Sequence, residues 1–208
     1  KFPPEKTIYL SLLKENGISP IRENSFAIPS IDKHSSFNKL WKVSEKFIES
    51  AKSEQKKISD FVELLSKRPL KLKQGLIDFW IPTFLFIRRD DFAIFNADGY
   101  IPTLSDENLE LIAKNPENYS IKTFDIEGVK LDIFNSYRTF LNQSTELKFD
   151  NNSFIETIKP FITFYKGLPE YSKQTKRLSV SALKIRTAIA TSKDPEETFF
   201  EAFPNALG

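Results

Sequence analysis

A chain of 208 residues is long enough for one sizeable core or two small ones, and its 40% apolar and 28% charged composition is typical of a globular protein, so disorder is not the default expectation. Thirty basic against 28 acidic groups leave a net charge of +2, which excludes a global field that draws the protein to nucleic acid or an anionic bilayer. The lack of cysteine excludes a disulfide framework, a thiol nucleophile and a cysteine-ligated metal, and fits a cytoplasmic location.

The first segment, residues 1–67, is predicted to be helical. Residues 4–15 form a short helix, because a proline stands at its start and an Asn-Gly pair follows its end. Residues 18–32 are predicted to be a loop. Apolar residues at helical spacing over residues 35–66 predict one long helix or two in series, with the charged residues 52–57 as a solvated bend.

The second segment, residues 68–142, carries the clearest pattern. Residues 75–87 are apolar nearly all round, but Asp78 and Pro82 interrupt them and they fall short of the ~18 residues that span a bilayer, so they predict a buried helix and no membrane partner. Two β-prone runs then flank Asn96-Ala97-Asp98-Gly99, a sequence typical of a hairpin turn.

Three more elements complete the second segment. Ser105 caps a helix that ends before Pro116, residues 119–128 predict a strand, and residues 129–142 predict a helix. This order of elements resembles a winged-helix module, an analogy that carries no function by itself. The predicted fold class is mainly α, with a small β-hairpin or short sheet and a winged-helix-like module in the middle.

The third segment, residues 143–208, is predicted to be helical and locally basic. Residues 154–166 form a helix that contains Pro160. The stretch between Glu170 and Asp194 then holds no acid and six basic residues: Lys173, Lys176, Arg177, Lys184, Arg186 and Lys193.

Helical spacing places four apolar residues of this stretch on one stripe, namely Leu178, Ala182, Ile185 and Ile189. Cations flank the stripe on both sides, as expected where their stems cover apolar surface and their charged ends stay in water. A site that tracks phosphates instead gathers cations on one open face between aromatic rings. Val180 and Leu183 lie off the stripe and predict a second apolar contact on the back of the helix.

A further helix is predicted to begin at Asp194-Pro195, where aspartate is a favoured N-cap and proline a favoured first residue. Phe199, Phe200 and Phe203 are then expected to dock onto the core or onto a missing continuation of the chain. Both ends of the sequence look like cuts from a larger protein.

No motif in the sequence is a strong catalytic signature. The phosphate loop is absent, and the single histidine, His34, cannot form a catalytic triad with sequence neighbours alone. Glu146-Leu147-Lys148, with Asp132 upstream, matches a magnesium nuclease pattern, but so short a motif arises readily by chance and a solvated loop is preferred. We expect no catalytic residue, no cofactor and no metal.

The C-terminal stretch also resembles a segment of very large, poorly characterised prokaryotic ATP-binding proteins, and residues 71–119 are similar to the region before that segment. The resemblance implies no catalytic residue and places the nucleotide site outside this chain. It lies in the spacing of Leu168-Pro169, Tyr171, Thr175, Leu178-Ser179, Ala182, Arg186, Asp194-Pro195, Phe199-Phe200, Pro204 and Ala206-Leu207-Gly208.

The preferred function is therefore a non-enzymatic coupling or protein-interaction module whose partners are other domains of such a parent protein. One alternative is a nucleic-acid-binding module, although residues 75–87 are too apolar to lie in a major groove. The other is the magnesium nuclease. Five cations are the candidate contacts to nucleic acid or to a partner: Lys173, Lys176, Arg177, Lys184 and Arg186.

Overall fold

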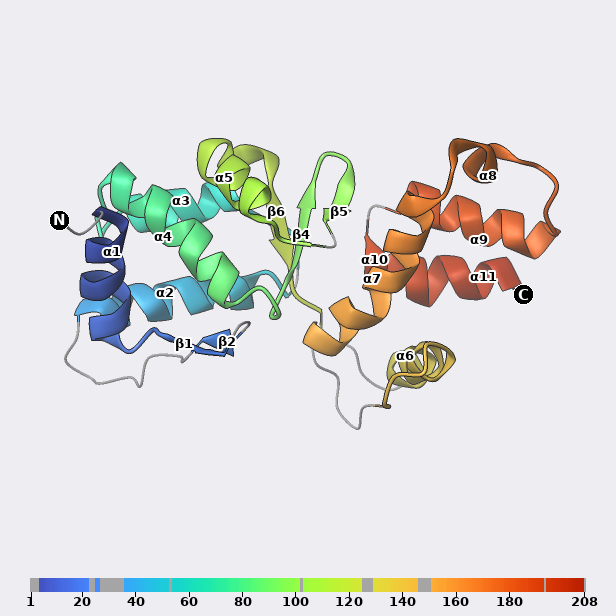
Figure 1. Cartoon of the computed structure of the whole chain (residues 1–208), viewed down its shortest axis with the longest axis horizontal. Coiled ribbons are helices and arrows are strands. Elements are labelled where there is room, and N and C mark those ends of the chain that lie inside the picture. The colour runs from blue at the N-terminus through green and yellow to red at the C-terminus, as the bar shows by residue number, and fades with distance from the viewer. Residues whose placement is uncertain are drawn as a thin grey trace.

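Two groups of helices lie on either side of a small antiparallel sheet in the computed structural model (Figure 1). The structure describes residues 4–22, 25–26, 36–52, 54–101, 103–124, 129–145, 151–192 and 194–207. The predicted fold class, mainly α with a short sheet, is confirmed.

The first group of helices comprises α1 (Pro4–Ile8), α2 (Ser36–Ser50), α3 (Ile58–Ser66), α4 (Gln74–Ile87) and α5 (Asp106–Lys114). The second comprises α6 (Val129–Phe140), α7 (Asn151–Gly167), α8 (Glu170–Gln174), α9 (Val180–Thr191), α10 (Pro195–Glu197) and α11 (Phe203–Leu207). The strands are β1 (Pro20–Arg22), β2 (Ser25–Phe26), β3 (Lys56–Lys57), β4 (Ala93–Asn96), β5 (Gly99–Ile101) and β6 (Ser120–Lys122). Short π and 3-10 turns are η1 (Tyr9–Leu13), η2 (Lys14–Asn16), η3 (Pro116–Asn118) and η4 (Thr198–Ala202).

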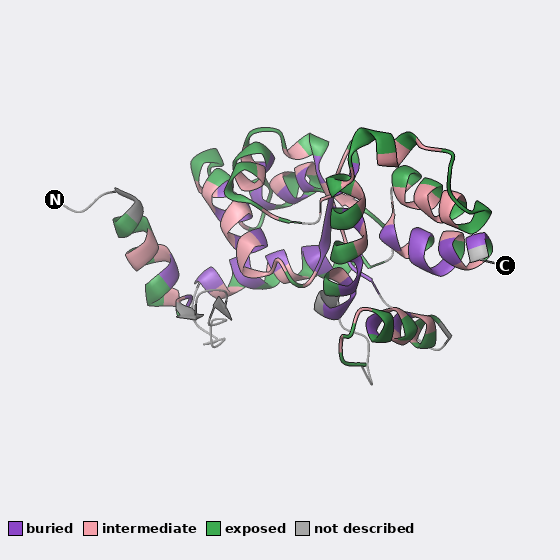
Figure 2. Cartoon of the chain, turned by 45° about the vertical axis from the view of Figure 1, so that its right-hand side comes forward, coloured by how far each residue is buried: buried purple, intermediate pink, exposed green. Residues whose placement is uncertain are grey.

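The sheet separates two hydrophobic cores because its strands alternate sides. Its strand order is β3-β6-β4-β5, with Ile94 paired to Ile121. Both isoleucines belong to the first core, whereas Ala93 and Phe95, on either side of Ile94, belong to the second. Successive residues of a strand point to opposite faces, so one four-residue strand serves both cores. Buried strand backbone is visible between the two helical groups (Figure 2).

The first core is an aromatic cluster centred on α4. Trp80 and Phe84 of this helix pack with Trp41 of α2, with Trp41 and Phe84 edge to face at a centroid distance of 5.2 Å. The Trp80 indole N–H donates to the buried Ser44 hydroxyl at 2.9 Å, which satisfies the one polar atom that the ring carries inward. The prediction that residues 75–87 form a buried helix is confirmed.

Two loop predictions in the first segment are wrong in detail. Residues 35–66 do form two helices in series, but Lys56–Lys57 between them is strand β3, paired antiparallel with β6 through Lys56 and Ile121. Within residues 18–32, expected to be a loop, β1 and β2 pair as a short hairpin. The partner of β3 lies far away in the sequence, and the pairing of β1 with β2 is irregular in register. Both pairings satisfy backbone hydrogen-bonding groups, but the local sequence gives no signal for either.

Local turn and cap chemistry elsewhere follows the prediction. Gly17 ends the first helical segment with φ of 81°, and Gly99 closes the β4–β5 turn with φ of 104°. The Ser105 side chain accepts a hydrogen bond from the Asn108 backbone N–H at 3.2 Å and so caps α5. The element order from α3 to α6 is the one expected, and the winged-helix likeness of that order stays a prediction.

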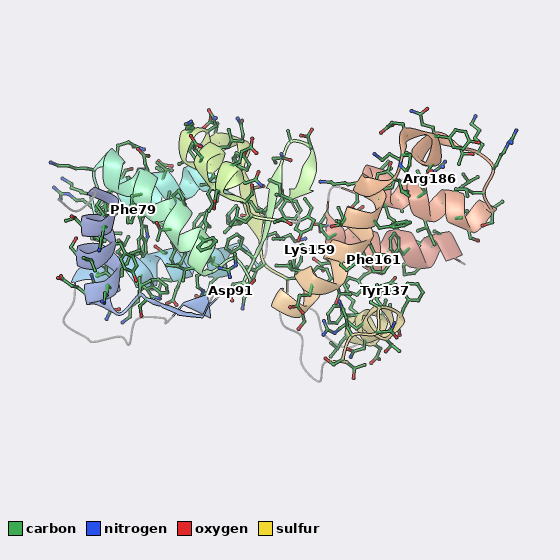
Figure 3. The ribbon with its side chains drawn as sticks, viewed as in Figure 1. Phe79, Asp91, Tyr137, Lys159, Phe161 and Arg186 are labelled. Carbon is green, nitrogen blue, oxygen red and sulfur yellow. The ribbon has the colours of Figure 1, made fainter. Side chains whose placement is uncertain are left out.

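The second core packs the end of the chain against α6 and α7. Phe199, Phe200 and Phe203 are buried in it, so the prediction that these rings dock onto the core is confirmed. The Tyr137 hydroxyl donates to the Phe199 carbonyl oxygen at 2.8 Å, and the Phe161 ring meets Phe199 edge to face at 5.0 Å (Figure 3).

A buried arginine joins α6 to α7 within this second core. Arg138 is 4% exposed, and its Nη1 donates to the Ser153 carbonyl oxygen at 3.1 Å and to the Thr157 hydroxyl at 3.2 Å. Its guanidinium also lies 5.6 Å from the centre of the Phe134 ring. These contacts offset part of the desolvation cost of the buried charge and fix the two helices in register.

Each core draws residues from two of the predicted segments. The first core runs from Leu13 to Ile121 and the second from Ala93 to Phe203. The cores therefore cross the boundaries of the segments 1–67, 68–142 and 143–208, which remain a prediction about the organisation of the chain.

An ionic cluster joins the C-terminal helices to the end of β6. Lys122 binds Asp194 and Glu196, and Glu196 also binds Lys130 at 3.0 Å. Burial by itself would raise the pKa of Glu196, but hydrogen bonds from Lys122 and Lys130 outweigh it and lower that pKa. Burial would likewise lower the pKa of Lys122, and its hydrogen bonds to Asp194 and Glu196 instead raise it.

Glu196→Gln is expected to destabilise the protein at neutral pH, by about 1 kcal/mol, because a charge-assisted hydrogen bond is lost. Since the carboxylate pKa is lower in the folded state, its contribution is complete above the ordinary glutamate pKa of about 4.3 and is lost as pH falls through the lower folded value. Urea unfolding from pH 7 to pH 3 should therefore show the deficit shrinking. Glu197→Gln, at an exposed neighbour, is the control; an equal effect there contradicts the prediction.

Phe199→Ala is expected to cost about 3–5 kcal/mol of unfolding free energy, because it leaves a cavity between α6, α7 and the end of the chain. Phe164→Ala is the matched control, since the Phe164 ring on α7 is 68% exposed and should cost within about 0.5 kcal/mol. Denaturant midpoints at constant slope measure both. Equal midpoints for the two variants would mean that the C-terminal helices do not belong to the core.

Candidate functional site

The basic stretch forms the outer surface of the second helical group. Its residues lie at the end of α8, in the connection to α9 and along α9 itself, and these parts of the chain are mostly exposed or half-buried (Figure 2). The five candidate contact residues divide into two kinds, those bound within the chain and those without an ion pair to any residue in the described part of the chain.

Arg186 and Lys173 are bound within the chain. The half-buried Arg186 donates through Nη1 to the carbonyl oxygens of Ser172 at 3.1 Å and Thr175 at 2.6 Å, which ties α8 and the following turn to α9 (Figure 3). The Lys173 ammonium pairs with Glu170 at 3.1 Å and lies 6.0 Å from the centre of the Tyr165 ring. Both cations therefore stabilise the fold of this segment.

Lys176, Arg177 and Lys184 form a second set, called the basic edge below. All three are exposed, and no ion pair to them is found within the described residues. The Arg177 backbone N–H donates to the Thr175 hydroxyl at 3.2 Å, so the turn before α9 is ordered while the side chain stays in solvent. The basic edge is the part of the stretch available to an anionic partner.

The start of α9 differs from the predicted stripe. Ser179 is the N-cap, since its hydroxyl accepts a hydrogen bond from the Ala182 N–H at 3.2 Å, and Leu178 lies outside the helix and is 43% exposed. Including Leu178 in the apolar stripe was wrong because α9 begins only after its N-cap, Ser179. Ile185, Ala188 and Ile189 instead form the face that packs on the second core.

An apolar groove of about 480 Å³ runs between α9 and α11 beside the basic edge. Val180 and Leu183, predicted to make an apolar contact on the back of α9, line it together with Lys184. Val180 is 70% exposed although it is a branched apolar side chain. Val180 and Leu183 therefore form an apolar face, but within the described residues this face is open along the groove and the predicted contact is not made.

Small side chains make the floor of the groove, and sequence reasoning missed them. Ala188 on α9 faces Ala202 and Ala206 from η4 and α11, so no large side chain fills the space between the two helices. The spacing of Ala202 and Ala206, four residues apart on one helical face, was the available signal.

The nuclease pattern is only partly within the described residues. Asp132 lies on α6 and is exposed, while Glu146, Lys148, His34 and Lys193 lie outside the residues that the structure describes. Among the described residues, no group of three or more metal-ligating side chains comes together. None of the described helices combines the length and the apolar character that crossing a bilayer requires.

Comparison with known protein families, curated proteins and solved structures finds no match to this chain. The resemblance to a segment of large prokaryotic ATP-binding proteins thus stays a prediction. What the α9–α11 surface can bind has to be argued from its shape, its apolar lining and its charges.

Arg186→Gln is expected to destabilise the protein by about 1–3 kcal/mol, because two carbonyl oxygens lose a charged donor. Lys184→Gln, two residues away on the same helix, should stay within about 0.5 kcal/mol since its charged end is solvated. Urea midpoints and amide exchange of residues 172–176 measure the difference. Equal stability of the two variants would show that Arg186 does not hold α8 to α9.

Proposed function

We propose that this chain is a non-catalytic protein-interaction module that binds an acidic amphipathic helix in the α9–α11 groove. In a larger prokaryotic ATP-binding protein of the kind that the sequence resembles, that helix comes from another domain of the parent, in the cytoplasm. The module then couples movements of its partner domain to the sheet and the first helical group.

The single observation that carries the proposal is an open apolar groove bordered by cations that have no ion pair with any residue the structure describes. Val180 and Leu183 expose apolar surface that a bound helix would remove from water, at about 25 cal/mol per Å². The small floor residues, among them Ala206, allow a helix backbone to approach closely. In helix-in-groove recognition, an apolar groove on one protein receives apolar side chains that the bound helix carries at helical spacing.

Charge complementarity selects an acidic partner. Lys184 lines the groove itself, and Lys176 and Arg177 precede the first turn of α9. A helix with glutamates beside its apolar stripe would pair with these cations at the rim of the interface, where each pair contributes about 0.5 kcal/mol. Three such pairs correspond to about tenfold in affinity.

The same three cations also support the alternative function, binding of nucleic acid. About three phosphate contacts give weak, salt-sensitive and sequence-independent binding. The apolar groove has no role in that alternative, so the two functions respond differently to a change inside the groove.

A designed helical peptide with leucines at i, i+3, i+4 and i+7 and glutamates on its other faces is the probe. We expect fluorescence anisotropy at 150 mM salt to give a micromolar Kd that is at least tenfold weaker for the variant Lys176→Glu/Arg177→Glu/Lys184→Glu. Thr187→Glu, which puts a charge at an exposed position of the groove lining, should weaken binding similarly.

The matched control is Lys39→Glu/Lys42→Glu/Lys46→Glu, which changes three exposed lysines of α2 and gives the same net charge. Its Kd should stay within threefold of wild type. A scrambled peptide of the same composition should bind at least tenfold more weakly than the designed one. Equal binding of the two peptides contradicts the proposal, and tight binding of a 20-nucleotide DNA strand that Thr187→Glu leaves unchanged favours the alternative.

A further inference from the structure

A second cavity, of about 270 Å³, lies between the sheet and α7, away from the α9–α11 groove. The end of α4 and the β4–β5 hairpin form one wall, with Phe92 and Ile94 of the first core and Tyr100 of the second. Ile155 and Lys159 of α7 form the opposite wall. The cavity therefore touches both helical groups at the place where they meet.

The cavity has a mixed lining, in which polar groups stand beside apolar side chains such as Phe92 and Ile94. Tyr100 is only 6% exposed, and its hydroxyl makes no hydrogen bond to any described residue. Burial raises the pKa of Tyr100, so the hydroxyl stays protonated and can donate a hydrogen bond at neutral pH. This hydroxyl is not among the fully buried polar atoms that lack a partner, so it is accessible from the cavity and can donate to an acceptor placed there.

Two cations and one acid border the same cavity. Lys159 lies on the side of α7 nearest the sheet and has no ion pair with a described residue (Figure 3). Arg89 is held in place, because its Nη1 donates to the Phe86 carbonyl oxygen at 2.9 Å and its guanidinium lies 4.7 Å from the centre of the Phe86 ring. Asp90 is exposed at the border. The net charge of +1 suits a ligand with a single negative charge.

We propose that this cavity binds a small carboxylic acid with an apolar body, with the carboxylate at Lys159 and the Tyr100 hydroxyl and the body against Phe92 and Ile94. The volume is at the small end of the range for ligand pockets, about 300–1,000 Å³, so the body holds about one ring. One acid among two cations disfavours multiply charged phosphates. The bound acid joins α7 to the sheet and stabilises their contact.

The probe is 3-phenylpropionate, with neutral 3-phenylpropionamide and cationic 3-phenylpropylamine as matched controls of the same shape. Titration of the ¹⁵N-labelled chain should give saturable shifts for residues of β4, β5 and α7, with a Kd at or below millimolar for the acid. The amide should bind at least fivefold more weakly, and the amine should not bind. Equal binding of the acid, the amide and the amine would overturn the proposal.

Lys159→Gln should weaken 3-phenylpropionate at least fivefold, whereas Lys166→Gln, an exposed lysine on the same helix, should leave the Kd within twofold. Tyr100→Phe should weaken the binding of 3-phenylpropionate more than the binding of toluene, an apolar control. Only the acid accepts a hydrogen bond from the Tyr100 hydroxyl. An unchanged Kd in Lys159→Gln, or shifts confined to α9 and α11, would overturn the proposal. Ile155→Phe, which fills the cavity, provides a second test: it should abolish binding with its unfolding midpoint retained, and unchanged binding would overturn the proposal.

Discussion

The rest of the structure depends on one short sheet that has a hydrophobic core on each face. Ile94 and Ile121, paired across β4 and β6, point into the first core, while Ala93 and Phe95 point into the second. A shift of one residue in this register would exchange the two faces of every strand. Both helical groups therefore pack on the same few paired strands.

The C-terminal helices divide the basic stretch into cations that build the fold and cations that face solvent. The Arg186 guanidinium donates hydrogen bonds to two carbonyl oxygens, whereas Lys184, two residues earlier, lines an open groove. Helical rotation explains the difference, because residues two apart on a helix lie on nearly opposite faces. The proposed binding of an acidic helix rests on that separation of structural and available charge.

Much of the local structure was predictable because it depends on neighbours in sequence. The buried character of α4 follows from its nearly continuous apolar composition, and Gly99 marks a turn because it tolerates positive φ. The burial of Phe199 and Phe200 was likewise expected from their density near the end of the chain. Strand β3 was missed, since two lysines become a strand only where β6 offers its edge.

The sequence by itself determined the fold class, most helix positions, the turn chemistry and the local excess of positive charge, because each depends on composition or on residues a few positions apart. Only the tertiary structure decided that the sheet serves two cores, that Arg186 is bound to backbone carbonyls while Lys184 is exposed at the groove, and that Ala188, Ala202 and Ala206 meet as the floor of that groove. Those outcomes depend on contacts between residues far apart in the chain, and no local pattern records which distant side chain will fill a space or leave it open.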